Sequence, residues 1–339
     1  MEQNNQNKVL IFGGFGFIGY HLTHKLVGMG KHVIVFGRES KITKDAFKKL
    51  EARYPNTLEL LYEEIDDLSL HELVHDEMDI SEVYHLAARK STTGSPNGIS
   101  LLEDNSYTDS QVFGFCDDLV RHKRAKGDTI GCKLLYMSSG EVHGSVHAVG
   151  KPVDETTPCV IDPTSNSNEY LASKVFAEMV LRFHPNKLFD WTIMRLQNPY
   201  GPYMDEKQVI PKMLRRVVGG KGSVELAMND TRPFIYIDDV VDAMILMMKS
   251  KKANGNTYNV TGKENIGMQR LIKSMDVIAD NLFFEKKNAI GTHRKIDISA
   301  IKKDLYWEPR VSIEEGVQRM RDYYIKSEAI ERAMRDIGL

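Results

Sequence analysis

Tyr170 and Lys174 are the two side chains in this sequence best suited to moving a proton at a hydroxyl or carbonyl carbon. They are four residues apart, and residues 175–181 continue with apolar side chains at helical spacing. Positions i and i+4 share one face of a helix, so the phenol and the ammonium are predicted to point the same way. A free phenol has a pKa of about 10, and a nearby ammonium lowers it. Taken alone, this spacing more often marks a solvated surface pair, so the acid/base interpretation depends on the rest of the chain.

A glycine triplet supplies the first supporting observation. Gly13, Gly16 and Gly19 follow a predicted strand at residues 8–12, and a predicted helix continues at residues 20–28. In this spacing the first glycine permits a tight turn, the second lets the backbone approach a pyrophosphate, and the third lets the helix pack against the strand. The free N–H groups at the helix N-terminus then bind phosphate. We therefore predict a dinucleotide-binding loop, rather than a merely tight turn, with cofactor contacts at Gly13, Phe15, Gly16, Phe17 and Ile18.

The end of the second predicted strand, residues 31–36, indicates which dinucleotide binds. NAD-binding folds usually have an acid at this point that holds the ribose 2′-OH. Here Gly37 and Arg38 follow the strand, so the acid is missing and a guanidinium is available for a 2′-phosphate. We predict NADP as the cofactor. NAD is the alternative if Arg38 only stacks on adenine or faces solvent.

The remaining strand signals place several small or polar residues at one edge of a sheet. Strands are predicted at residues 58–65, 82–88 and 133–137, and a long helix at residues 105–121. Strands that alternate with helices form a parallel doubly wound sheet, whose ligands bind beyond the carboxyl ends of the strands. The glycine loop, Ala87 with Ala88, and Ser138 with Ser139 all lie at such ends. Because the alanines are small, the ribose of a cofactor can approach them.

The composition excludes several other classes of protein. The chain has 339 residues, 42% of them hydrophobic, and a formal net charge of −2. A near-neutral chain gives no electrostatic basis for binding nucleic acid or a membrane surface, and no apolar run approaches the roughly 18 residues of a membrane span. The three cysteines show no metal-ligand spacing, so no metal site is predicted. A low, odd number of cysteines and a polar start without a signal peptide predict a cytoplasmic protein.

With these features placed, the chain resembles the extended short-chain dehydrogenase/reductase family, the NAD(P)-dependent nucleotide-sugar epimerases and dehydratases. The resemblance runs from Val9 to about Tyr324 and rests on Asn105, on Tyr170 with Lys174, and on residues 13–19, 85–88, 138–144, 195–202, 232–240, 258–260 and 307–309. It implies an α/β fold in which a Rossmann-type doubly wound parallel sheet is joined by a smaller C-terminal substrate lobe. The NAD(P)-binding domain is expected at residues 8–195, with a return at about 236–261. The nucleotide-sugar-binding lobe is expected at residues 196–235 and 262–339.

The resemblance also implies roles for individual residues. Ser139 and Tyr170 would hydrogen-bond the sugar hydroxyl or ketone, with Tyr170 as the acid/base. Lys174 would bind the nicotinamide ribose and lower the pKa of the phenol. Asn198 would lie near the diphosphate of the nucleotide sugar, and Arg232 would contact it, since an Arg fork suits phosphate oxygens.

Further cofactor contacts and a partner follow from the same resemblance. The remaining residues assigned to the cofactor are Lys90 for a phosphate, Asp66 with Asp67 for the adenine amine, and Leu86, Ala87 and Ala88 beside the ribose. Asn105 is expected to brace the loops beside the site. In the family, homodimers form through the helices that correspond to residues 105–121 and 170–183, so a homodimer is expected here.

The reaction is predicted from Gly140 and Glu141. In the 4,6-dehydratases of the family this loop carries an Asp, which protonates the leaving C6 hydroxyl, and then a Glu, which removes the C5 proton. Glycine cannot donate a proton, so 4,6-dehydration is disfavoured here. The decarboxylase branch shares the Glu but usually differs around its Tyr. Redox chemistry at C4 remains, and the Gly37–Arg38 pair favours NADPH-dependent reduction of a nucleotide 4-keto-(6-deoxy)sugar.

Several alternatives stay open. A 4-epimerase resembling UDP-galactose 4-epimerase is the main one. Glu141 is a candidate catalytic residue, or equally a structural acid in a tight loop. A non-catalytic NAD(P)-binding module and an RNA-binding relative are further alternatives, but the presence of Ser139, Tyr170 and Lys174 together weighs against both.

Overall fold

The computed structural model describes residues 7–76, 79–90, 99–144, 152–165, 168–183, 187–219, 222–226, 230–275, 282–286 and 295–336. Its centre is a sheet of seven parallel strands in the order β11-β6-β5-β4-β1-β2-β3. The strands are β1 (Lys8–Phe12), β2 (Val33–Phe36), β3 (Leu58–Leu61), β4 (Ile80–His85), β5 (Lys133–Ser139), β6 (Asp190–Leu196) and β11 (Thr257–Val260). The strand order reverses between β1 and β4, which is where a doubly wound sheet binds its ligand. The predicted fold class is confirmed.

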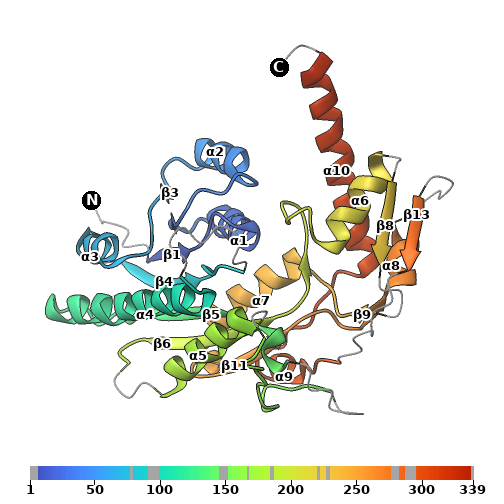
Figure 1. The fold of residues 1–339 in the computed structure, drawn as a ribbon. Helices are drawn as coiled ribbons and strands as arrows, with labels where there is room; N and C mark the ends of the chain where they lie inside the picture. Colours follow the sequence, from blue (N-terminus) through green and yellow to red (C-terminus); the bar gives the residue numbers. More distant parts are fainter. Residues whose placement is uncertain are drawn as a thin grey trace.

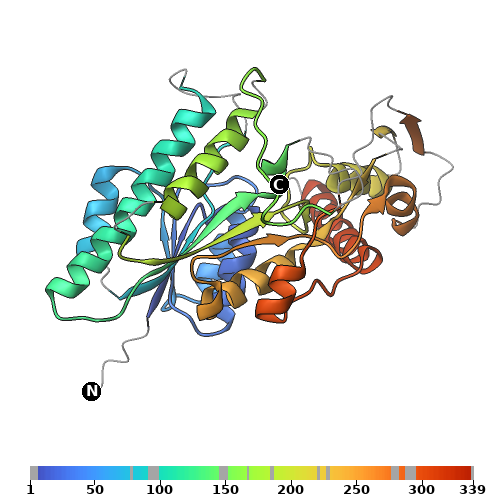
Figure 2. The same ribbon diagram turned by 90° about the horizontal axis from the view of Figure 1, so that it is seen from below.

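Helices cover both faces of this sheet (Figures 1 and 2). On one face, α3 (Asp67–Asp76), α4 (Leu101–Ala125) and α5 (Glu169–Phe183) lie side by side. On the other face, α1 (Phe17–Gly28) contacts α7 (Ile237–Lys249), and α2 (Lys44–Arg53) adds Phe47 to the same core. Strands such as β2 are apolar and buried along their whole length, because both faces of the sheet are covered.

The rest of the described chain forms further helices and short strands outside the central sheet. They comprise the 3-10 helices η1 (Gly140–His143) and η3 (Lys251–Ala253), the strands β7 (Pro199–Tyr200), β8 (Gly222–Leu226), β9 (Thr231–Arg232), β10 (Ile235–Tyr236), β12 (Ile266–Gly267) and β13 (Leu282–Lys286), and the helices α6 (Val209–Gly219), α8 (Met268–Ser274), α9 (Ser299–Leu305) and α10 (Ile313–Asp336). The helices α6, α8 and α10 gather beside β8 and β13 (Figure 1). Between these elements, β11 returns to the central sheet beside β6. The division into a cofactor domain and a substrate lobe stays a prediction.

Local hydrogen bonding explains where the element boundaries differ from those predicted. The strand predicted at residues 58–65 ends at Leu61, because its partner β2 ends at Phe36. The helix predicted at residues 105–121 starts earlier, at Leu101. There the Ser100 side chain accepts from the Glu103 backbone N–H at 3.1 Å, and the Glu103 carboxylate accepts from the Ser100 N–H at 3.1 Å. This reciprocal pair satisfies two donors at the helix start and extends α4 toward the site. Among the helices of the described ranges, none is apolar over enough residues to cross a membrane.

Candidate active site

The glycine loop after β1 is packed tightly against the residues that follow β4. Gly13 has a φ of +71°, and a Cβ built on it would lie 2.5 Å from the Ala87 backbone nitrogen. A Cβ on Gly19 would lie 2.2 Å from the Gly14 carbonyl oxygen. Any side chain at Gly13 or Gly19 would therefore separate the loop from its neighbours, as expected for the turn and packing glycines.

Gly16 differs from the other two glycines. It is the N-cap of α1, and a Cβ built on it would meet nothing closer than the Gly13 carbonyl oxygen at 3.5 Å, an ordinary contact. The packing of the protein itself does not require glycine at this position. A phosphate that approaches the helix N-terminus would require it, so the loop fits the pyrophosphate of a dinucleotide.

The three bulky residues of the loop serve the core as well. Phe15 is buried and stacks on Tyr62, with ring centroids 4.5 Å apart and an interplanar angle of 17°. Its carbonyl oxygen accepts a hydrogen bond from the Thr43 hydroxyl. Phe17 and Ile18 are partly buried against the same core. Any contact between Phe15 and a cofactor would come from its backbone.

The predicted contacts for the adenosine end lie at the ends of β2 and β3. Gly37 has a φ of +141°, which favours glycine, and the Arg38 side chain is 59% exposed with its Nε 3.9 Å from a Glu64 oxygen. Asp66 accepts a hydrogen bond from the Ser69 N–H at 3.0 Å, so one carboxylate oxygen caps α3. Asp67 lies in the first turn of α3. The role of these residues at adenosine stays a prediction.

Leu86, Ala87 and Ala88 follow β4, which ends at His85. The exposed side chain of Lys90 places its Nζ 5.9 Å from the centre of the Tyr170 ring. The Asn105 side chain accepts from the Arg89 N–H at 2.8 Å and donates to the Arg89 carbonyl oxygen at 3.0 Å. It therefore braces the segment that carries Lys90, as expected.

Tyr170 and Lys174 both lie on α5, and the Lys174 Nζ is 5.9 Å from the centre of the Tyr170 ring. The shared helix face is therefore confirmed. The Lys174 ammonium, however, donates to the hydroxyl of Tyr136 at 3.0 Å. Burial raises the pKa of Tyr170 above its ordinary value, and the nearby Asp109 carboxylate raises it further. The net pKa of this phenol is therefore raised and not lowered as predicted, because burial and Asp109 outweigh the effect of the ammonium.

The loop after β5 contains Ser139, Gly140 and Glu141. The Ser139 hydroxyl accepts from the Glu141 N–H at 3.2 Å and caps η1. A Cβ on Gly140 would lie 3.0 Å from both the Cβ and the Oε1 of Gln197. The Gln197 side chain thus fills the space beside Gly140, and its Nε2 donates to Glu141 Oε1 at 3.0 Å. Gln197 was not identified from the sequence, although a polar residue directly after a largely buried strand is a usable signal.

A buried ion pair supports the same strand ends. Arg195 on β6 lies 2.7 Å from Glu178 on α5, and both side chains are at most 5% exposed. The Ser138 hydroxyl donates to the same Glu178 carboxylate at 2.6 Å. The pair links α5, which carries Tyr170, to the ends of β5 and β6, and so it helps to hold the end of β5, where Ser139 lies, against that helix.

The predicted substrate contacts lie on the small strands beyond the sheet. Asn198 adopts a left-handed backbone with a φ of +49°, and its carbonyl oxygen accepts from the Ile235 N–H at 3.1 Å. Arg232 on β9 donates from Nε to Asp230 at 2.7 Å, and its side chain is 41% exposed. A Cβ on Gly201 would lie 3.4 Å from a ring carbon of Phe17, so this segment lies against the start of α1.

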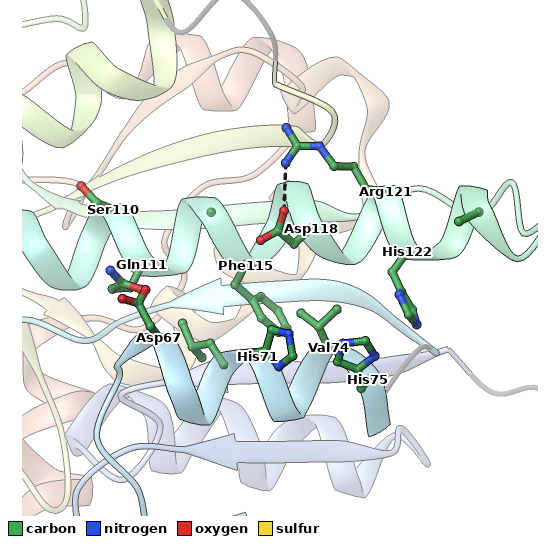
Figure 3. Close-up of a pocket in the computed structure, with 13 residues that line it drawn as sticks. Asp67, His71, Val74, His75, Ser110, Gln111, Phe115, Asp118, Arg121 and His122 are labelled. Atoms are coloured by element: carbon green, nitrogen blue, oxygen red, sulfur yellow. Dashed lines mark hydrogen bonds and ion pairs between the residues drawn. The ribbon is translucent and has the colours of Figure 1, made fainter.

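A cavity of about 700 Å³ lies apart from the predicted catalytic residues, between α3 and α4. Figure 3 shows His75 of α3 beside His122 of α4, with His71 next to His75 along α3. The ring centroids of His75 and His122 are 4.8 Å apart. Within the described ranges, no group of three or more His, Cys, Asp or Glu side chains is arranged to hold a metal ion.

Known proteins match the chain along nearly all of its length. A family model described as GDP-mannose 4,6 dehydratase matches residues 10–320. UDP-glucuronic acid decarboxylase 1 of Arabidopsis thaliana is 27% identical over 329 residues, which cover 92% of this chain and 68% of that protein. The fold matches a dTDP-glucose 4,6-dehydratase from Bacillus anthracis solved with NAD, at a TM-score of 0.76 and 21% identity over 95% of this chain and 97% of that one. It also matches a UDP-glucuronic acid 4-epimerase from Bacillus cereus solved with UDP-glucuronic acid and NAD, at a TM-score of 0.76 and 23% identity. That match covers 94% of this chain and 99% of the epimerase chain.

Proposed function

Because the chain belongs to the GDP-mannose 4,6 dehydratase family, within the extended short-chain dehydrogenases/reductases, we propose that it is an NAD(P)-dependent enzyme that acts at C4 of a nucleotide-linked sugar. The reaction that we propose is reduction of a nucleotide 4-keto-(6-deoxy)sugar. The observation that carries this choice is the surroundings of Gly140. They hold an amide, from Gln197, where elimination would need an acid.

Elimination across C5 and C6 needs a proton donor for the leaving hydroxyl and a base for the C5 proton. An Asp at position 140 would supply the donor, but its Cβ would come 3.0 Å from Gln197 and would require that side chain to shift. Glu141 alone, bonded to Gln197 Nε2 at 3.0 Å, leaves the base without the acid. The site therefore suits redox chemistry at C4 better than dehydration.

Reduction of a ketone requires a protonated donor at its oxygen. The raised pKa of Tyr170 keeps its phenol protonated at neutral pH, so Tyr170 can hydrogen-bond the C4 carbonyl oxygen and donate its proton there. The Ser139 hydroxyl would supply the second hydrogen bond to that oxygen. A bound nicotinamide would supply the hydride that forms the new C4–H bond. Proton transfer leaves a phenolate on Tyr170, and the Lys174 ammonium on the same helix stabilises that charge.

The glycine loop, Ala87 and Lys90 would hold the cofactor. We propose NADP(H), since Gly37 carries no carboxylate and Arg38 is exposed and able to pair with a 2′-phosphate. NAD remains the alternative, because the relatives with known structure are described with NAD. Asn198 and Arg232 would contact the diphosphate of the nucleotide sugar. The unpaired thiols of all three cysteines support the cytoplasm as the compartment.

We also infer a homodimer. Phe176, Met179 and Phe183 follow one another at helical spacing on α5, and their exposed fractions are 47%, 52% and 73%. Such a stripe exposes apolar area that a second copy would cover. Sedimentation equilibrium should therefore give twice the chain mass. Replacing Met179 and Phe183 by Glu should give monomers, and a monomeric unaltered protein would overturn the inference.

The reaction is tested by supplying NADPH with 4-keto-6-deoxy nucleotide sugars and following absorbance. Stoichiometric loss of NADPH, with formation of a C4 hydroxyl in the product, is expected. Interconversion of C4 epimers without net cofactor change would instead establish the 4-epimerase, the alternative favoured by the epimerase among the structural relatives.

The same assay separates the remaining outcomes. A 4-keto-6-deoxy product from a plain hexose nucleotide would show that Gly140 does not prevent dehydration. Carbon dioxide release from UDP-glucuronic acid would show decarboxylation, which the curated relative named above is described to perform. Cofactor binding without turnover of any of these substrates would indicate a non-catalytic module.

A further inference from the structure

Lys174 is one end of a row of four buried, hydrogen-bonded side chains that links α5 to α4 and to the central sheet. Its Nζ donates to the Tyr136 hydroxyl at 3.0 Å, and that hydroxyl donates to Asp109 Oδ2 at 3.0 Å. The other oxygen of Asp109 lies 2.7 Å from His85 Nε2. These four side chains come from α5, β5, α4 and β4, and the residues are at most 2% exposed.

The hydrogen-bond pattern defines the charge on each group. Tyr136 accepts from the ammonium and donates to the carboxylate, so its phenol is neutral. Burial lowers the pKa of His85, and its Nδ1 is buried without a partner in the described part of the chain. His85 is therefore the neutral tautomer that donates from Nε2 to Asp109. The four hydrogen-bonded side chains then carry one negative charge, on Asp109, and one positive charge, on Lys174.

Each bond between Lys174, Tyr136 and Asp109 is 3.0 Å long, so the ammonium and the carboxylate are no more than 6 Å apart. At that distance, and out of contact with water, opposite charges hold each other strongly. We propose that Asp109 is the fixed counter-ion of the Lys174 ammonium, with Tyr136 as the bridge between them and His85 as the second donor that holds the carboxylate. Asp109, Tyr136 and His85 are then positioning residues for Lys174.

Other charged groups near Lys174 do not replace Asp109. Glu178 on α5 also faces it, but that carboxylate accepts two bonds from Arg195 Nε, at 3.0 and 3.2 Å, and one from Arg195 Nη2 at 2.7 Å. Lys90 carries a positive charge and opposes the ammonium. Tyr170 is neutral while protonated. Among the described residues, Asp109 is thus the carboxylate near Lys174 that no cation pairs with directly.

The same geometry indicates that these four hydrogen-bonded side chains hold charge and do not conduct protons. Their far end, His85 Nδ1, is buried and meets no partner within the described residues. A proton that entered at Lys174 would have no exit there. This row of side chains therefore keeps Lys174 protonated inside a site where burial lowers the pKa of that amine.

This inference rests on the proposed role of Lys174, and it has a kinetic consequence. Reduction needs both Lys174 and Tyr170 protonated, so its rate falls at alkaline pH as the first of them loses its proton. Asp109→Asn removes a negative charge that raises both pKa values. The alkaline limb of kcat/KM should therefore move to lower pH by about one unit or more.

Two further variants test whether that pH shift comes from the charge of Asp109. Asp118→Asn removes the same charge from the same helix at a side chain that is 61% exposed, and it should leave the limb in place. Tyr136→Phe removes the bridge but keeps the charge, so it should move the limb less than Asp109→Asn and raise KM for the cofactor. An active Asp109→Asn enzyme with an unmoved limb would overturn the proposal.

A second measurement does not depend on activity, so it separates failure of this inference from failure of the proposed function. Asp109→Asn and Lys174→Met each leave one buried charge without its partner and should each lower Tm by several degrees. The Tm of the double variant should fall by much less than the sum of the two single decreases. Additive losses would refute the pairing. If Asp109→Asn does not fold, folding of the double variant supports the proposal and its failure to fold counts against it.

Discussion

Tyr170→Phe is expected to reduce turnover on the true substrate by a factor of about 100 or more, the usual size of a general acid–base contribution. The phenol hydroxyl is the group that would donate a proton to the C4 oxygen, and phenylalanine keeps the ring while removing only that hydroxyl. The ring lies within 6 Å of two cations, with Lys90 and Lys174 each 5.9 Å from its centre, and this arrangement survives the change. Binding of the cofactor should therefore be retained.

The control for this experiment is Tyr306→Phe, since Tyr306 is 84% exposed and its substitution should leave turnover unaltered. Lys174→Ala should behave differently from Tyr170→Phe and weaken both turnover and cofactor binding. Single-turnover kinetics and cofactor titration distinguish the two effects. Full turnover by Tyr170→Phe would show that another group moves the proton.

A preference for NADP(H) over NAD(H) of about tenfold or more is the second large effect expected, and Arg38→Ala should remove most of it. A hydrogen-bonded contact with a charged phosphate contributes roughly 1.5–3 kcal/mol, which corresponds to about 10- to 100-fold in affinity. Arg38 now lies 3.9 Å from Glu64, with both side chains more than half exposed, at 59% and 68%. A pair this exposed is weak, so the guanidinium can turn to a phosphate at little cost.

Glu64→Gln is the matched variant for this test. It removes the carboxylate that competes for Arg38 and would repel a 2′-phosphate, so the preference for NADP(H) should widen. Titration calorimetry with NADP(H) and with NAD(H) measures the difference between the two affinities for each variant. Equal or tighter binding of NAD(H) by the unaltered protein would establish NAD as the cofactor, in agreement with the relatives described with NAD.

The parts of the fold that depend on local patterns could be predicted from the sequence. Strands β1, β2 and β5 and helix α5 occur where apolar runs and helical spacing place them. The glycine spacing identified the turn after β1, because Gly13 and Gly19 are required by contacts within a short stretch and with the next strands. The family resemblance then supplied the doubly wound class of the sheet, whereas the order of its strands comes from the structure, because no local pattern contains it.

The surroundings of the predicted site residues could not be predicted in the same way. Gln197 lies 56 residues from Glu141, and Tyr136 lies 38 residues from Lys174, yet each pair is hydrogen-bonded. Asp109 stands among buried residues of α4, where a charged side chain is a signal that some partner exists, but the sequence does not say which. Only the packing of α4 against β4 and β5 brings His85 and Tyr136 to it.

The sequence by itself therefore determined which residues are candidates for chemistry and which class of fold holds them, because residue type and short-range spacing suffice for both. The tertiary structure alone decided how these residues are charged. The pKa of Tyr170 is raised rather than lowered, since burial and the Asp109 carboxylate act on it while the Lys174 ammonium is bonded to Tyr136. Burial and charge pairing depend on groups that are distant in the chain and adjacent in space, and only the folded arrangement defines them.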